Sequence, residues 1–313
     1  MRTRLLIGCM LFAALTCAQE RIELLPFGDF ESWTVRYVTE SKILGGETKA
    51  LYMIAKTDTV YGNEPFTPSA ASPWGSGNAH AKAFGIDKVS VSVTPERRGK
   101  GWCCRMASRL ETVKAAGMNL KVMATGSIYT GRLTDPVGMQ HSSDPNSAID
   151  MGIPFTKRPK ALMLDYKARI QDQPILFANA SKRVKTVEGR DEGQIVLILQ
   201  YRWEENRHVY AYRVGTATEH ITTSTEGWVN NHRIPVRYGD ITGDEDYKPW
   251  EILRTNRQKT RNSAGKMVCI EEIGWRGDLT PTHMIIQIAA GCQKPFTGCP
   301  GNVVWVDNIR LVY

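Results

Sequence analysis

The sequence predicts an all-β protein, a jelly-roll-like antiparallel β-sandwich with long loops. Short runs of alternating or β-branched residues follow one another along the chain, separated by Gly, Pro and Asn. Sustained repeats with a period near 3.6 residues, which would indicate helices, are few. The composition, 42% hydrophobic and 23% charged, is that of an ordinary globular protein. It argues against disordered, collagen-like and coiled-coil proteins.

The N-terminus has the pattern of a secretory signal peptide. Two arginines lie among the first four residues, residues 5–15 form an apolar core, and small residues follow this core. We therefore expect cleavage after Ala18 and export of residues 19–313 to the periplasm or cell surface. The alternatives are a lipoprotein acylated at Cys17 and a first core helix. After this segment no apolar run approaches the roughly 18 residues of a membrane-spanning helix, so no transmembrane segment is expected after cleavage.

The clearest element is a β-hairpin. Residues 194–203 and 207–218 are predicted as its strands, joined by a turn at residues 204–206. In the second strand the run His-Val-Tyr-Ala-Tyr-Arg-Val alternates in polarity, which is typical of a strand with one buried face.

Nine further segments have strand character, which makes eleven strands, enough for two packed antiparallel sheets. In chain order they are residues 49–55, 89–93, 102–110, 120–129, 161–170, 228–238, 266–273, 282–290 and 303–313. A short helix is expected at residues 249–258. Loops at residues 63–78 and 134–154 are too long for tight turns, and such loops often carry function. No repeat or linker divides the chain, so residues 19–313 are expected to form a single domain.

The charges and motifs exclude several classes of function. The formal net charge is +8, but the basic clusters are interleaved with acidic residues and are typical of solvated faces. Together with export, this argues against nucleic acid as a partner. The sequence has no GxSxG, HExxH, P-loop or GxGxxG pattern after a strand. The six histidines have no spacing typical of metal ligands.

A glycosidase is harder to exclude, because it needs only two facing carboxylates. The candidate acids are Glu204 with Glu205, Glu271 with Glu272, and the cluster at residues 240–246. The first pair lies in a turn, the third group in a solvated loop, and neighbours on a strand point to opposite faces. The catalytic residues therefore stay unknown, and a binding protein is favoured over an enzyme.

Sugar binding needs a flat aromatic face and polar groups at its rim. Four of the eight tryptophans lie within strand patterns and are expected in the core: Trp33, Trp102, Trp203 and Trp305. Trp74, Tyr247 and Trp250 lie in loops and are the aromatic residues most expected at the surface. With Asn78, they are the candidate carbohydrate-binding residues.

Five cysteines follow the predicted leader, so at least one thiol should be free. Cys292 and Cys299 flank a loop, and a disulfide between them is expected if that loop is a hairpin in an oxidising compartment. The adjacent Cys103 and Cys104 point to opposite faces of a strand and should not bond to each other.

The two ends of the mature chain resemble those of jelly-roll carbohydrate-binding modules. The start, Phe-Gly-Asp-Phe-Glu-Ser-Trp at residues 27–33, is similar to their opening, and Trp-Val-Asp-Asn-Ile at residues 305–309 to their closing strand. In those modules the Glu and Asp at these places help to hold a structural calcium. The resemblance therefore points to a calcium site at Glu31 and Asp307, with Asp29 nearby. The alternative is that these acids are satisfied by hydrogen bonds at turns and strand edges.

A second resemblance covers about residues 27–313. Its motifs include Pro-Trp-Gly-Ser-Gly-Asn at residues 73–78, residues 93–101, Gly-Ser-Ile-Tyr at residues 126–129, residues 238–242 and the closing segment 301–313. The most specific part runs from Gly-Ile-Pro-Phe at residue 152 to Asp-Tyr-Lys at residue 167. In this order the motifs resemble the putative carbohydrate metabolism domain (PCMD) family, exported proteins of Gram-negative gut anaerobes. The resemblance implies a jelly-roll-like β-sandwich but no established reaction. The vicinal cysteines and the Cys292 to Cys299 pair depart from that pattern.

Export, the sandwich, the loop aromatics and this resemblance lead us to expect a protein that binds or handles glycans at the cell envelope. Its expected partner is an oligo- or polysaccharide, and its one expected cofactor is the structural calcium. The alternatives are a glycoside hydrolase or lyase with an unidentified carboxylate pair, and a structural or adhesive envelope protein. The last would show a large exposed apolar patch without a pocket.

Overall fold

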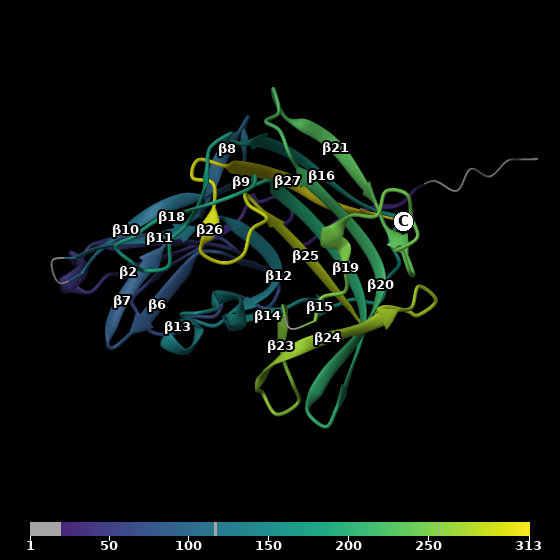
Figure 1. The fold of residues 1–313 in the computed structure, drawn as a ribbon, viewed down its shortest axis with the longest axis horizontal. Coiled ribbons are helices and arrows are strands. Elements are labelled where there is room, and N and C mark those ends of the chain that lie inside the picture. The colour runs from purple at the N-terminus through teal and green to yellow at the C-terminus, as the bar shows by residue number, and fades with distance from the viewer. Residues whose placement is uncertain (1–19, 116–117, 256) are drawn as a thin grey trace, which may run out of the picture.

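The computed structural model describes residues 20–115, 118–255 and 257–313 (Figure 1). The predicted signal peptide, residues 1–18 with Cys17, lies outside these residues. The all-β prediction is confirmed, because the helices of the described chain are single 3-10 turns. They are η1 (Lys42–Leu44), η2 (Met139–His141), η3 (Pro145–Ala148) and η4 (Pro249–Glu251). None of them is long and apolar enough to cross a membrane.

The prediction of a helix at residues 249–258 is therefore wrong. Pro249 starts the turn η4, and the extended backbone of Ile252 ends it. The buried carboxylate of Glu251 accepts hydrogen bonds from Thr218 and Arg237. These contacts fasten the turn to the neighbouring sheet instead of letting a helix continue.

A six-stranded sheet forms one layer. Its strand order is β21-β16-β27-β9-β8, and β1 pairs with β27. The bounds are β21 (Val229–Pro235), β16 (Ala161–Arg169), β27 (Val303–Val312), β9 (Gly101–Ala107), β8 (Val93–Arg98) and β1 (Ile22–Leu24). The pairings in this sheet are antiparallel. The strand order places β27, from the end of the chain, between β16 from its middle and β9 from its first third.

A ten-stranded sheet forms the second layer, in the order β15-β25-β19-β20-β24-β23-β14-β12-β5, with β22 paired to β20. An additional pairing between β12 and β25 closes seven of these strands into a ring. The bounds are β5 (Trp74–Ser76), β12 (Ser127–Leu133), β14 (Ile149–Met151), β15 (Ile153–Pro154), β19 (Gly193–Glu205), β20 (His208–Ile221), β22 (Arg237–Tyr238), β23 (Lys259–Arg261), β24 (Met267–Trp275) and β25 (His283–Ala289).

Four small sheets surround these layers. They are β3 (Thr48–Ile54) with β2 (Trp33–Thr39) and β4 (Asp58–Tyr61); β13 (Val137–Gly138) with β6 (Ala79–Ala83) and β7 (Ile86–Ser90); β10 (Arg109–Ala115) with β11 (Met118–Ala124); and β18 (Lys185–Val187) with β17 (Ile175–Phe177) and β26 (Thr297–Gly298). In Figure 1 β2, β6, β7, β10 and β11 lie together on the left of the molecule.

The main core lies between the two large sheets. Alternate residues of β16 and β27, such as Leu164 and Val306, face alternate residues of β19 and β25, such as Leu197 and Ile286. Phe30, close to the N-terminus, belongs to the same cluster and is fully buried. Because side chains alternate along a strand, this core determines which residues are left on the opposite faces.

Candidate functional site

The ends of β19 and β20 carry a row of aromatic side chains. On β19, Ile195, Leu197 and Leu199 face the main core, and Tyr201 and Trp203 continue the same alternating row toward the hairpin turn. Across the ladder Tyr201 pairs with Tyr212, and Trp203 pairs with Tyr210. We call Tyr201, Trp203, Tyr210 and Tyr212 the aromatic platform. This hairpin end lies at the lower edge of the molecule in Figure 1, beside β23 and β24.

The platform rings support one another. The Trp203 ring centroid lies 5.0 Å from that of Tyr212 and 5.7 Å from that of Tyr210, and Tyr201 is 6.2 Å away. Tyr201 is 37% exposed, and the other three rings are half-buried. The rings are inclined to one another, with interplanar angles of 42° for Tyr201 and Trp203, 30° for Trp203 and Tyr210, and 33° for Trp203 and Tyr212. Because the rings restrain one another, the apolar surface they form is preorganised.

Polar groups surround the platform. On the face of the platform, the pair that follows Trp203 and Tyr210 is Glu205 with His208, and both are exposed. Glu271 lies opposite Tyr210 on β24, and the Arg276 guanidinium lies 5.7 Å from the Tyr212 ring. Among the described residues, the hydroxyls of Tyr129 and Tyr238 donate hydrogen bonds to backbone carbonyl oxygens. The platform tyrosines in the same part of the chain make no such bond. The platform hydroxyls are thus available to a ligand.

The opposite face of the same strands holds a buried charged network. Glu272 on β24 accepts hydrogen bonds from Arg213 Nε at 2.7 Å and from Gln200 Nε2 at 2.6 Å. Arg202 Nε donates to Gln200 Oε1 at 2.7 Å, and Arg202 Nη1 donates to the Met151 carbonyl oxygen. The network ties β19, β20 and β24 together behind the platform and fixes their positions.

Burial and charge pairing shift the pKa values in this network. Burial alone would raise the pKa of Glu272, but the Arg213 guanidinium and several hydrogen bonds outweigh it and hold the pKa below its ordinary value. Burial lowers the pKa of Arg202 to about 10, so Arg202 stays a cation at neutral pH. Because Glu272 is only 1% exposed, it is a structural anion that no substrate reaches.

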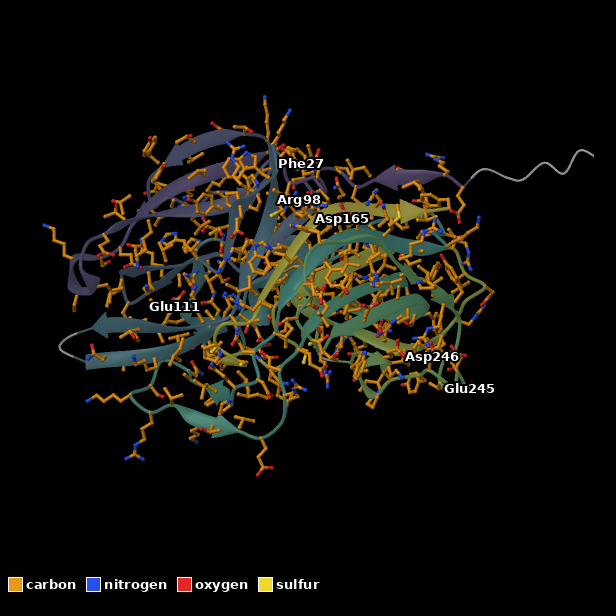
Figure 2. The ribbon with its side chains drawn as sticks, turned by 90° about the horizontal axis from the view of Figure 1, so that it is seen from above. Phe27, Arg98, Glu111, Asp165, Glu245 and Asp246 are labelled. Atoms are coloured by element: carbon orange, nitrogen blue, oxygen red, sulfur yellow. The ribbon has the colours of Figure 1, made fainter. Side chains whose placement is uncertain are left out.

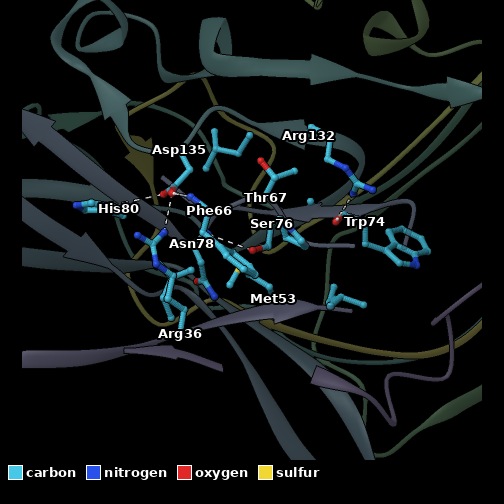
Figure 3. A pocket seen from close by; sticks show the side chains of 15 residues that line it. Arg36, Met53, Phe66, Thr67, Trp74, Ser76, Asn78, His80, Arg132 and Asp135 are labelled. Carbon is cyan, nitrogen blue, oxygen red and sulfur yellow. Dashed lines mark hydrogen bonds and ion pairs between the residues drawn. The ribbon is translucent and has the colours of Figure 1, made fainter. Parts of the chain in front are cut away.

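The predicted sugar-binding residues Trp74 and Asn78 are buried, at 2% and 4% exposure. They line a cavity of about 60 Å³ together with Arg36, His80 and Asp135 (Figure 3). Binding pockets usually measure about 300–1,000 Å³, so this cavity holds only a few waters. The Asn78 side chain bonds to the backbone of Tyr52, Ser92 and Val93 and acts as a clamp between segments.

The other predicted pair, Tyr247 and Trp250, is separate from this cavity. Both residues are half-buried. The Trp250 ring stacks on the His220 imidazole, with centroids 3.9 Å apart and an interplanar angle of 9°. One face of Trp250 is therefore covered by the protein itself.

The predicted calcium residues are not brought together as a cluster of ligands among the described residues. Glu31 Oε1 accepts a hydrogen bond from the Trp102 amide, and Asp29 accepts one from the Glu31 amide. Asp307 instead accepts a hydrogen bond from Arg98 Nη1 at 2.7 Å. The same nitrogen lies 2.9 Å from Asp165, and Figure 2 labels Arg98 and Asp165. A guanidinium thus supplies the positive charge beside Asp307.

Cys292 and Cys299 are both free thiols, so the predicted disulfide is not present in the structure. The Asp191 carboxylate accepts hydrogen bonds from the backbone amides of both cysteines, at 2.9 Å each. This carboxylate closes the loop in place of a disulfide. Burial raises the pKa of the Cys292 thiol to about 11, so the thiol is protonated at neutral pH.

A second cavity, of about 380 Å³, lies between residues 70–73 and β14 and β15. Its walls are mostly Pro, Ala and Gly, and it contains no aromatic side chain. Its charged groups are already engaged, since Arg132 donates to the carbonyl oxygens of Ser69 and Trp74 and Asp150 accepts from Thr260.

The platform was not among the predicted sites, because Trp203 was expected in the core. The available signal was the pattern Tyr-x-Trp before the turn and Tyr-x-Tyr after it, which places four rings on one face of a hairpin. Of the other tryptophans expected in the core, Trp33 and Trp305 are buried, while Trp102 is half-buried.

Comparisons with known proteins add a family and a fold. The family model described as putative carbohydrate metabolism domain matches residues 30–312. A solved structure described as a putative glycoside hydrolase from Bacteroides thetaiotaomicron is 19% identical, with 93% of this chain and 71% of that chain covered and a TM-score of 0.50. Another so described, from Bacteroides vulgatus, is 14% identical, with 93% and 94% covered and a TM-score of 0.43. No curated protein matches the sequence.

Proposed function

The chain belongs to the putative carbohydrate metabolism domain family, and we propose that it binds glycans on the aromatic platform of β19 and β20. The observation that carries this proposal is the row of four mutually packed rings, partly exposed and bordered by Glu205, His208 and Glu271.

This arrangement suits a sugar chain for physical reasons. One side of a pyranose carries mainly C–H groups and is stabilised against a flat aromatic ring, while the hydroxyls need hydrogen-bond partners at the rim. The rings lie in two tiers along the hairpin, Tyr201 with Tyr212 and Trp203 with Tyr210. Successive sugar units can therefore contact successive tiers, so an oligo- or polysaccharide is the expected ligand.

Glycan arrays followed by calorimetry test the proposal. Trp203→Ala and Tyr210→Ala should each weaken glycan binding by about 30-fold, the loss expected when an aromatic residue at the centre of an interface is truncated. Tyr61→Ala is the matched control, because Tyr61 is a 77% exposed tyrosine outside the platform. Circular dichroism checks that each variant is folded. Failure of the wild-type protein to bind any glycan, or unchanged binding by both platform variants, would overturn the proposal.

A second candidate function, glycoside hydrolysis, has one specific observation in its favour. Asp165 and Asp307 both contact Arg98 Nη1, so their oxygens lie within about 6 Å of each other, close to the spacing of a retaining enzyme. Their pKa values also differ in direction. Burial raises that of Asp307; for Asp165 burial is outweighed by hydrogen bonds from Asn231, Asn308 and Arg98, which lower it.

We favour binding over hydrolysis because both carboxylates are paired with arginines. Arg98 holds the two together, and Arg310 contacts Asp165 as well. The test is release of reducing ends from a glycan that the wild-type protein binds. Our proposal predicts no release; activity that is lost in Asp307→Asn and kept in Trp203→Ala would establish the hydrolase instead.

Export is part of the proposal. It is supported by the cationic start, apolar core and small residues within residues 1–18. Expression of the full chain followed by cell fractionation and N-terminal sequencing should recover a protein that begins at Gln19 outside the cytoplasm. An unprocessed cytoplasmic protein would contradict export.

A further inference from the structure

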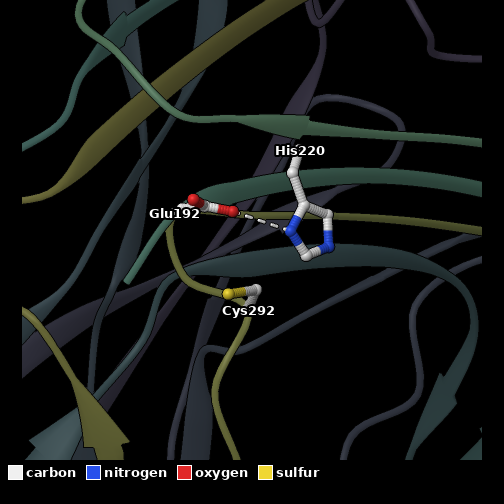
Figure 4. A group of neighbouring side chains, drawn as sticks. All are labelled: Glu192, His220 and Cys292. Carbon is white, nitrogen blue, oxygen red and sulfur yellow. Dashed lines mark hydrogen bonds and ion pairs between the residues drawn. The ribbon is translucent and has the colours of Figure 1, made fainter. Parts of the chain in front are cut away.

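Glu192, His220 and Cys292 form a compact cluster at the end of β19 and β20 that lies opposite to the platform. One ligand atom from each of the three side chains lies within 4.8 Å of the other two (Figure 4). Glu192 Oε2 lies 2.9 Å from His220 Nδ1. This is the one group of three or more His, Cys, Asp or Glu side chains with such close ligand atoms in the described part of the chain.

The fold holds all three residues in place. Glu192 immediately precedes β19, His220 lies near the end of β20, and Cys292 follows β25. These strands are neighbours, since Gln194 pairs with both His220 and Ala289. The Asp191 carboxylate anchors the Cys292 amide at 2.9 Å, and the stacked Trp250 ring fixes the plane of the His220 imidazole.

We propose that Glu192, His220 and Cys292 bind a zinc ion, or a divalent transition metal of the same class. A thiolate, an imidazole and a carboxylate are the ligands that zinc takes in proteins, with water in the fourth position when the protein supplies three. Zinc would displace the proton of the Cys292 thiol, which is released to solvent on binding. Calcium and magnesium require oxygen ligands, so the sulfur and nitrogen disfavour them. This site is distinct from the suggested calcium site at Asp29, Glu31 and Asp307.

The distances require little rearrangement. A tetrahedral zinc with bonds of about 2.0–2.3 Å separates its ligand atoms by about 3.3–3.7 Å. The cluster therefore needs to adjust by about 1 Å to hold the ion. His220 is 9% and Glu192 is 23% exposed in their side chains, so an ion can enter from the Glu192 side.

The metal would stabilise this end of the molecule and take no part in events at the platform. About ten residues of β19 separate Glu192 from Trp203, and an extended strand rises about 3.3 Å per residue. The eleven steps from Glu192 to Trp203 thus place the two sites about 35 Å apart along the strand. Zinc would join the loop after β25 to the ends of β19 and β20, a linkage that the expected disulfide does not supply in this structure.

Zinc titration of the purified, metal-stripped full chain tests the proposal. Calorimetry should detect about one Zn²⁺ per chain, and Tm should rise by a few degrees at saturating zinc. Co²⁺ as a probe should give a thiolate charge-transfer band. Cys292→Ala and His220→Asn should each lower the affinity at least about 100-fold, since each removes a direct ligand. Cys269→Ala is the control, because Cys269 is a half-buried free cysteine on β24 outside the cluster.

A measurement on the unmodified protein decides the matter if the variants fold poorly. Peptide mapping measures the rate at which each cysteine is alkylated. Zinc should slow the alkylation of Cys292 and leave the alkylation rate of Cys269 unchanged. Absence of stoichiometric zinc binding, equal alkylation of Cys292 with and without zinc, or full affinity in both folded cluster variants would overturn the proposal. None of these results bears on glycan binding, which the platform variants test separately.

Discussion

Glu271 and Glu272 are neighbours in the chain and lie in opposite environments. Glu272 is 1% exposed and bonded to Arg213 and Gln200, while Glu271 is half-buried beside the platform. The expectation that vicinal acids on a strand cannot form a facing pair follows from alternation alone. Which of the two is buried depends on the layers packed around β24.

We predict that Glu272→Gln destabilises the protein by about 3–5 kcal/mol, because it leaves the buried Arg213 guanidinium without its counter-charge. The matched control, Glu271→Gln, should change the free energy of unfolding by less than about 0.5 kcal/mol. Urea unfolding measures both values. Equal effects of the two substitutions would contradict the role assigned to the network.

Glu272 also makes the stability of the protein depend on pH. The pKa of Glu272 in the folded protein is held below its ordinary value of 4.5. A carboxyl with a lowered pKa contributes stability that is fully present above pH 4.5 and is lost as the pH falls through the lower, folded value. The wild-type protein should therefore lose more stability than Glu272→Gln on acidification below pH 4.5. Parallel losses in urea titrations at several pH values would exclude this contribution.

Exposure of single aromatic residues was the least predictable property. Trp74 was expected at the surface and is 2% exposed, whereas Trp203 was expected in the core and is half-buried. A strand pattern shows which residues share a face, but not where the opposing sheet ends. Trp203 lies on the core-facing side of β19, but beyond the end of the opposing sheet. Trp74 packs against Phe30 from the N-terminal segment.

At the scale of elements, the predicted hairpin is confirmed with a shorter turn. The first strand ends at Glu205 and the second begins at His208, so Asn206 and Arg207 alone form the turn. Both have positive φ angles, 51° and 67°. This is the pattern of a type I′ turn, whose second central position favours glycine.

We predict that Arg207→Gly stabilises the protein by about 0.5–1 kcal/mol, because glycine adopts a positive φ without the strain of a side chain. Arg207→Lys, which keeps the strain and the charge, should leave stability unchanged. Thermal unfolding of the two variants checks this. Glycan affinity should stay constant in both, since the platform rings are unaffected; a lower stability for the glycine variant would contradict the turn geometry.

Strand boundaries were predictable only where local pattern decides them. The segment expected at residues 120–129 is two strands, β11 and β12, interrupted before Ser127. A Cβ atom at Gly126 would lie 2.4 Å from the Ala107 backbone nitrogen, so the chain needs a glycine where it crosses β9. The short strands β14 and β15 lie within the loop expected at residues 134–154, and β23 follows the helix expected at residues 249–258. Long-range partners define all three strands.

At the scale of the whole molecule, two packed and mainly antiparallel layers could be predicted from the sequence. The parallel pairings of β20 with β24 and of β14 with β23, and the closure of the ring, could not. The ring depends on the pairing of Asp150 with Lys259 and of β12 with β25, between segments more than one hundred residues apart. Composition and periodicity carry no information about such pairs, because they describe only near neighbours in the chain.

The single domain expected for the mature chain makes a thermodynamic prediction. The main core contains Phe30 and Trp33 from the start of the described chain, Leu197 from its middle and Leu311 from its end. Because these residues share one apolar cluster, the segments should lose their structure together. We predict one cooperative unfolding transition, with coincident near- and far-ultraviolet circular dichroism curves.

Two phenylalanines provide the test of this coupling. Phe30 is fully buried and Phe84 is 87% exposed, and both have positive φ angles, so backbone effects of a substitution should be alike. Phe30→Ala should cost about 3–5 kcal/mol and shift the whole transition to lower denaturant without splitting it, whereas Phe84→Ala should have almost no effect. If Phe30→Ala instead produces an early partial transition while signals from β19 and β20 stay unchanged, the N-terminal segments form a separate folding unit.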